Sequence, residues 1–124
     1  MPVVFSIIES PLHPDFSDLY RRLGYKELKL GSVRKAIQAL KQQIPDLIVA
    51  DFIYGYGSNY AGVNISNLDV FLYSLQKYKQ DSRIILLVEK AEQQYVEKLK
   101  EMFPIHSILV YPVKLSEMEQ ALKQ

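Results

Sequence analysis

Cysteine is absent from this chain of 124 residues, and so is any apolar run long enough to span a bilayer. The absence of cysteine excludes disulfides, thiol catalysis and thiolate metal sites. An excess of one charge is also missing, since 15 basic and 14 acidic residues leave a net charge of +1. Proteins dedicated to nucleic acid usually carry a strong basic excess, and a signal peptide would need a basic start and a cleavage site. We therefore expect a cytoplasmic protein that binds neither nucleic acid nor membrane.

Short apolar runs recur along the chain and predict β-strands. Four of them are apolar on both faces, as is typical of the central strands of a covered parallel sheet, and they cover residues 3–8, 47–50, 84–88 and 108–110. Residues 25–30 alternate polar and apolar side chains instead. That alternation predicts a fifth strand nearer the edge of the sheet.

Segments with the apolar spacing of helices lie between and after these runs, at residues 16–23, 33–40, 66–75, 91–102 and 116–122. Ser32 is a suitable cap for the second helix, and residues 66–69 and 116–119 have the form of capping boxes. Five β-α units in strict alternation predict a parallel sheet with right-handed crossovers. The length favours a single domain, residues 1–124, with an α/β three-layer sandwich of flavodoxin-like (βα)5 type and sheet order 2-1-3-4-5.

Acidic residues follow three of the predicted strands. Glu9 comes after the first, Asp51 after the third and Glu89 after the fourth. Ligands of open parallel sheets bind beyond the carboxyl ends of the strands, so Glu9 and Asp51 are expected to converge on one pocket. Mg²⁺ takes one or two carboxylates and keeps its waters. Glu9 and Asp51 are thus a weak magnesium candidate, and no other cofactor is indicated.

Three segments resemble the receiver domains of response regulators, the CheY-like superfamily. Residues 45–51, Pro-Asp-Leu-Ile-Val-Ala-Asp, resemble the segment that ends in the phosphorylated aspartate of that family. Leu-Gly-Tyr at 23–25 is similar to its helix-to-strand junction, and Val-Tyr-Pro-Val at 110–113 is similar to its Lys-Pro-Phe segment. The resemblance covers the whole chain in element order and implies that Asp51 is the phosphoacceptor candidate.

The same resemblance implies helper groups that this chain largely lacks. The acidic pair after the first strand is here Glu9 and Ser10, with one carboxylate. Val88 or Glu89 stands in place of the family's hydroxyl, and Tyr111 stands in place of its lysine. Phosphoryl transfer depends on positioning and on stabilising charged oxygens. We therefore expect a degenerate receiver whose phosphorylation is weak or absent.

The loop at residues 53–65 is unusually long for this family. Tyr54, Tyr56 and Tyr60 alternate with glycines within residues 54–62. Glycine permits tight or left-handed backbone, and tyrosine supplies large amphipathic rings. The segment predicts either a binding lip over the pocket or a long mobile loop.

Two tyrosines and two histidines complete the candidates. Tyr95 and Tyr111 are expected on the face formed by the fourth helix and the fifth strand, where receiver domains commonly dimerise or meet partners. That face is our candidate interaction surface, although the rings could equally cover the edge of the core. His13 and His106 have no ligand partner at i+3 or i+4, so both are expected at the surface.

The leading hypothesis is a stand-alone receiver-like module of two-component signalling, without enzymatic activity, that works through protein–protein contact. Its partner would be a sensor kinase, a downstream signalling protein or a second copy of the chain. The alternative is a flavodoxin-like domain that binds a nucleotide, a flavin or another small ligand with the loop 54–62. The absence of a phosphate-cradling glycine or Ser/Thr loop after the first strand argues against that alternative.

Overall fold

The computed structural model describes residues 1–54, 66–79 and 81–123, so the predicted loop residues Tyr56 and Tyr60 lie outside the described residues. Five strands form one parallel sheet in the order β2-β1-β3-β4-β5. The strands are Val3–Ile7 (β1), Lys26–Leu30 (β2), Leu47–Asp51 (β3), Arg83–Val88 (β4) and Ser107–Val110 (β5). The predicted fold class and strand order are confirmed.

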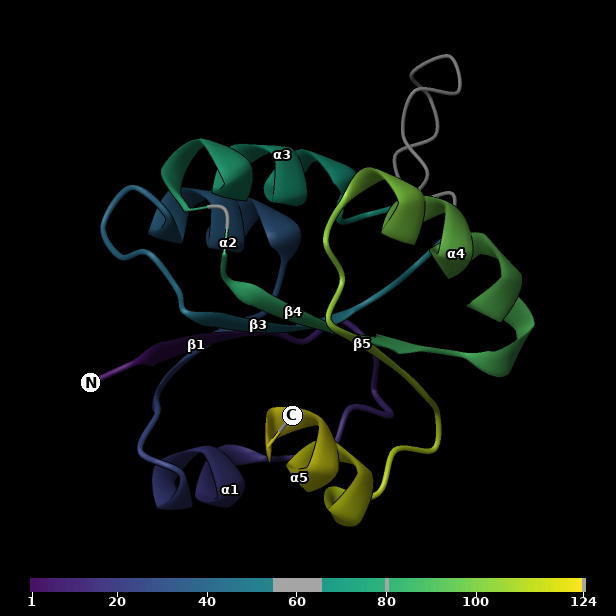
Figure 1. Cartoon of the computed structure of the whole chain (residues 1–124), viewed down its shortest axis with the longest axis horizontal. Coiled ribbons are helices and arrows are strands. Elements are labelled where there is room, and N and C mark those ends of the chain that lie inside the picture. Colours follow the sequence, from purple (N-terminus) through teal and green to yellow (C-terminus); the bar gives the residue numbers. More distant parts are fainter. Residues whose placement is uncertain (55–65, 80, 124) are drawn as a thin grey trace.

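Helices cover both faces of the sheet. They are Ser17–Arg22 (α1), Val33–Ala39 (α2), Asp69–Tyr78 (α3), Gln93–Met102 (α4) and Leu115–Lys123 (α5), and a short 3₁₀ turn, Lys90–Glu92 (η1), leads into α4. Helices α2, α3 and α4 lie on one face, and α1 and α5 lie on the other (Figure 1). The result is the predicted three-layer sandwich.

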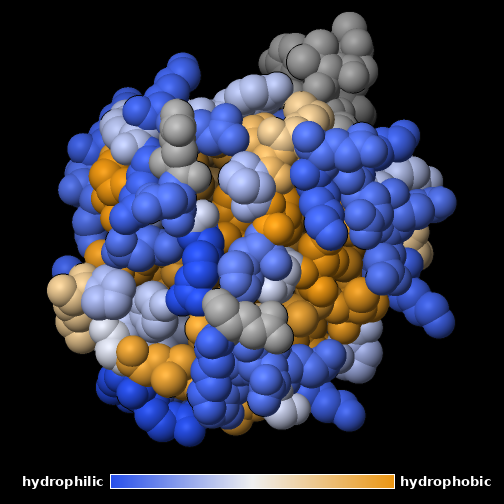
Figure 2. All heavy atoms as spheres, in the orientation of Figure 1, coloured by the Kyte–Doolittle hydropathy of each residue, from blue (hydrophilic) through white to orange (hydrophobic). Residues whose placement is uncertain are grey.

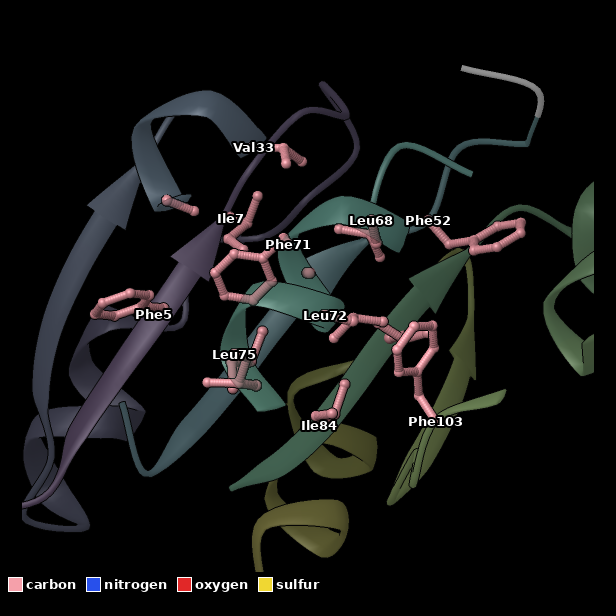
Figure 3. Packing of buried hydrophobic residues seen from close by; sticks show 14 of the residues in the cluster. Phe5, Ile7, Val33, Phe52, Leu68, Phe71, Leu72, Leu75, Ile84 and Phe103 are labelled. Atoms are coloured by element: carbon pink, nitrogen blue, oxygen red, sulfur yellow. The ribbon is translucent and has the colours of Figure 1, made fainter. Parts of the chain in front are cut away.

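Two hydrophobic clusters hold the layers together. On the side of α2, α3 and α4, the rings of Phe5 and Phe71 lie 6.5 Å apart within the cluster shown in Figure 3. The strand β3 supplies both clusters, because Ile48 packs into this one and Val49 into the cluster under α1 and α5. Burial of such a side chain stabilises the fold by about 1.5–3 kcal/mol. This two-sided burial explains why the central strands are apolar on both faces.

The predicted helix start is correct for α2 and differs for α3 and α5. The Ser32 side chain accepts a hydrogen bond from the Lys35 N–H at 3.2 Å, as predicted for the cap of α2. At the third helix, the Ser66 N–H donates to the Asp69 carboxylate at 2.8 Å as in a capping box, but α3 begins only at Asp69 and not directly after Ser66.

The capping box predicted at residues 116–119 is wrong by two positions. Helix α5 begins at Leu115, and the Glu117 carboxylate accepts a hydrogen bond from the Lys114 N–H at 2.9 Å. The chain offers glutamates two residues apart, Glu117 and Glu119, so spacing alone did not decide which one closes the first turn. Ser116 instead lies exposed inside the helix.

Candidate functional site

Asp51 lies at the carboxyl end of β3, where the backbone leaving β1 passes over it. The two strands pair through Ile7 and Ala50, so Asp51 projects one residue beyond the last pair. Its Oδ2 accepts hydrogen bonds from the N–H groups of Glu9 at 2.8 Å and of Ser10 at 2.9 Å. The predicted convergence of residues 9–10 with Asp51 therefore exists, but it is made through the backbone.

Two side chains, one from this same connection and one from the loop after β5, complete the surroundings of Asp51. Tyr111 follows β5, and its hydroxyl donates a hydrogen bond to Asp51 Oδ1. The Nδ1 of His13 lies 3.1 Å from both carboxylate oxygens, and it must carry a proton because an ionised carboxylate only accepts. Asp51 is 1% exposed, so four donors from two segments enclose a carboxylate with almost no access to water.

These donors decide the charge of the site. Burial raises the pKa of Asp51, but the hydrogen bonds from His13, Tyr111 and the Ser10 backbone outweigh it, and the net result is a lowered pKa. Burial and the bond to Asp51 raise the pKa of Tyr111, so its hydroxyl stays protonated and keeps donating. Asp51 is therefore a buried anion that is stabilised by hydrogen bonds.

The position of His13 corrects the expectation of a surface histidine. Its side chain is 2% exposed and its Nδ1 lies within hydrogen-bond distance of the Asp51 carboxylate, whereas His106 is exposed as expected. The absence of partners at helical spacing says nothing about partners on another strand. The available signal was that His13 lies four residues after Glu9, on the connection that crosses the carboxyl edge of the sheet.

Glu9 is held by a residue that the sequence analysis did not single out. The Asn67 side chain donates to Glu9 Oε1 at 2.7 Å and to the backbone oxygen of Asp51 at 2.9 Å. Partial burial raises the pKa of Glu9, the bond from Asn67 lowers it, and the nearby Asp51 charge raises it further, with a raised pKa as the net result. Asn67 thus ties the start of α3 to the ends of β1 and β3.

The residues around Asp51 suit a magnesium ion poorly. Both Asp51 oxygens already accept hydrogen bonds, and the raised pKa of Glu9 disfavours the ionised form that a cation needs. In the described residues, no three or more His, Cys, Asp or Glu side chains form a cluster that could hold a metal. The predicted Glu9–Asp51 magnesium site would require Asp51 to give up donors.

The other helper positions also differ from a phosphoryl-transfer site. Val88 is buried at the end of β4, and Glu89, which follows it, is exposed and adds negative charge near Tyr111. Lys114 is exposed beyond the end of β5, and its N–H is engaged at the start of α5. A neutral tyrosine hydroxyl can donate one hydrogen bond to Asp51 but cannot neutralise transferred phosphoryl oxygens.

Tyr54, Tyr95 and Tyr111 occupy two different places. Tyr54 stacks on Tyr95 with ring centroids 3.6 Å apart, and its N–H donates to Glu92 at 3.0 Å. Tyr95 also packs against the cluster under α2, α3 and α4, whereas Tyr111 belongs to the cluster on the opposite face of the sheet. Tyr111 is 9% exposed and points inward, so it does not share an outer surface with Tyr95.

Apolar side chains gather around the edge strand β5. Figure 2 shows them as one patch between α4 and α5, extending upward toward α3. All four residues of β5 are partly exposed, among them Ile108, Leu109 and Val110, and Met102 at the end of α4 is 40% exposed. Exposed apolar patches are common where proteins contact one another.

Comparison with known proteins finds similar structures but no similar sequences. The chain matches no family of protein sequences, and no curated protein is similar to it in sequence. Its structure is similar to a response regulator receiver protein from Sinorhizobium medicae, with 20% identity, a TM-score of 0.68, and coverage of 99% of this chain and 91% of the other.

Two further receiver domains show the same likeness. One is from Clostridium thermocellum, with 14% identity, a TM-score of 0.67 and coverage of 99% and 92%. The other is the receiver domain of a sensor histidine kinase from Pseudomonas aeruginosa, with magnesium coordinated in its active-site cleft, at 17% identity, a TM-score of 0.63 and coverage of 98% and 94%. The chain therefore has the fold of the response regulator receiver domains. In the part of the chain that is described, no helix has the length and apolar character to cross a membrane.

Proposed function

We propose that this chain is a degenerate receiver module of two-component signalling that acts in the cytoplasm through protein–protein contact, with Asp51 as a structural anion and not as a working phosphoacceptor. The observation that carries the proposal is the enclosure of Asp51 by Tyr111, His13 and two backbone N–H groups. The fold supports the signalling class, and the occupied carboxylate supports the loss of phosphorylation. The proposed signalling class rests on the similarity of the fold to receiver domains.

The chemistry of phosphoryl transfer explains why this arrangement opposes it. An attacking carboxylate oxygen needs a free lone pair directed at phosphorus, and both oxygens of Asp51 are occupied by donors. The product would replace the single charge of the carboxylate with about two charges on the acyl phosphate, close to Glu9 and Glu89. The lowered pKa of Asp51 makes its carboxylate a weaker nucleophile.

The test is intact-mass spectrometry after incubation with Mg²⁺ and acetyl phosphate. We expect no phosphoryl adduct on the native chain, while an active receiver domain treated in parallel gains one. The Tyr111→Lys variant restores the family's residue, and Asp51→Asn serves as its negative control. A labile adduct on the native chain that is absent from Asp51→Asn would refute the structural role of Asp51.

The patch around β5 is the surface that we assign to the protein partner, either a signalling protein or a second copy of this chain. Position-specific photo-crosslinking in the native host tests this assignment. A crosslinker at Leu109, in β5, is expected to capture one defined protein, whereas one at the exposed Lys35 of α2 is expected to capture none. Equal capture from both positions would argue against a partner surface at β5.

A further inference from the structure

A cavity lies at the carboxyl edge of the sheet, close to Asp51. Tyr111, which is hydrogen-bonded to Asp51, forms part of its wall. Its volume is about 680 Å³, which is within the range of about 300–1,000 Å³ for small-molecule sites. One wall is formed by Leu12 and Pro14 of the connection after β1. Another is formed by Tyr111, Pro112 and Val113, and the third by residues 89–92 of the connection after β4.

The polar groups of this cavity are confined to one wall. Glu89, Lys90 and Glu92 lie together on the segment after β4, and the other lining residues are apolar. Two carboxylates against one ammonium leave this wall with one net negative charge. Glu92 is also fixed in place, since its Oε1 accepts the Tyr54 N–H at 3.0 Å.

Tyr111 connects this cavity with the Asp51 site. The Tyr111 hydroxyl donates to Asp51, which is also in contact with His13, and the charge of Glu89 acts on the same hydroxyl. The electron-rich face of a tyrosine ring also attracts cations. An apolar cavity with negative charge on one wall is therefore complementary to a molecule with an apolar body and one positive group.

We propose that this cavity binds a small organic cation of the arylalkylamine or alkylguanidine class, with its apolar body against Leu12, Pro14 and Val113 and its charged group toward Glu89 and Glu92. Binding here does not depend on the phosphorylation state of Asp51. The proposal therefore stands or falls separately from the proposed signalling function.

The test is a titration of the full chain, ¹⁵N-labelled, with 2-phenylethylamine, 2-phenylethanol and 3-phenylpropionate, followed by amide chemical shifts. These probes share an aromatic body and differ in charge. We expect shifts at residues 89–92 and 113, and an affinity for the amine about five-fold above that for the alcohol, the ratio that two exposed charge–charge contacts of ordinary strength supply together.

A matched pair of double variants separates the cavity from general charge effects. Glu89→Gln with Glu92→Gln removes both charges, and the glutamine oxygen can still accept the Tyr54 N–H, so the preference for the amine should disappear. Glu97→Gln with Glu101→Gln, on exposed positions of α4 outside the cavity, makes the same change in net charge and should leave the preference intact. Equal affinity for all three probes, preference for the carboxylate, or no shifts at the cavity would overturn the proposal.

Discussion

The hydrogen bond from Tyr111 to Asp51 can be removed with little change in packing. Tyr111→Phe keeps the buried ring and deletes the hydroxyl, so Asp51 loses one of its four donors. A hydrogen bond to a charged group contributes about 1.5–3 kcal/mol, and the remaining anion stays buried where water cannot replace the donor. We expect the free energy of unfolding to fall by that amount.

The loss should be visible as a lower melting temperature. The entropy of unfolding is about 2.1 cal/mol/K per residue, or about 0.26 kcal/mol/K for a chain of 124 residues, so the midpoint should fall by roughly 6–12 °C. Urea unfolding followed by circular dichroism measures the free energy directly. Tyr73→Phe is the matched control, because Tyr73 is 51% exposed and its hydroxyl lies on an outer helix surface.

A double-mutant cycle identifies the partner of the hydroxyl. With Asp51→Asn and the combined variant, the coupling energy between Asp51 and Tyr111 should be about 1–3 kcal/mol. If Tyr111→Phe is as stable as the native chain, or if the two changes are additive, Asp51 does not depend on this hydroxyl. The account of a hydrogen-bonded structural anion would then be wrong.

Three other substitutions test separate parts of the structure. The pKa of Asp51 is lower in the folded state than its unfolded value of about 3.9. The ionised carboxylate therefore adds fully to the free energy of unfolding above that value, and this addition is lost as the pH falls through the folded pKa. Urea midpoints below pH 5 should therefore decline less steeply for Asp51→Asn than for the native chain, and parallel declines would contradict this. The pKa of Glu9 is raised in the folded state, so its ionised form destabilises the fold at pH 7. The Glu9→Gln variant can still accept the hydrogen bond from Asn67 and should be more stable than the native chain at that pH. A clear loss of stability would show that the charge is needed. Gly24 has φ of +88° and open space at its Cβ position, so Gly24→Ala should cost about 1–2 kcal/mol through the backbone alone. Gly31→Ala, where φ is not positive and the space is also open, is its control and should leave the melting temperature nearly unchanged.

The strand ends were predictable because they depend on local sequence. The apolar run that ends in Asp51 is buried on both sides, so it could only be a central strand, and its last residue had to lie at the carboxyl edge of the sheet. Leu-Gly-Tyr at 23–25 contains the one described glycine with positive φ, at the predicted junction between α1 and β2. The register of α5 was not predictable, because Glu117 and Glu119 satisfy similar patterns.

The surroundings of Asp51 could be predicted only in part. The nearness of residues 9 and 10 follows from the sheet order, but the bonds come from their N–H groups and not from the Glu9 carboxylate. The sequence left open whether Tyr111 lies on an interaction face or covers the edge of the core, because the residue type does not show to which side of the sheet it turns, and the structure places it in the core. The loop residues Tyr56 and Tyr60 fall outside the described residues, so the prediction for them stays open.

The sequence by itself determined the five β-α units and the position of Asp51 at a strand end, since these rest on periodicity and on the handedness of short connections. The strand order was predicted from the chain length and the fold type that it favours. Only the tertiary structure decided what surrounds that aspartate. His13 and Tyr111 lie 38 and 60 residues from Asp51 in the chain, and their contacts with it depend on the path of two loops. Short-range patterns carry no information about such paths. The polar groups of a loop can form hydrogen bonds in many conformations until the sheet fixes the two ends of the loop.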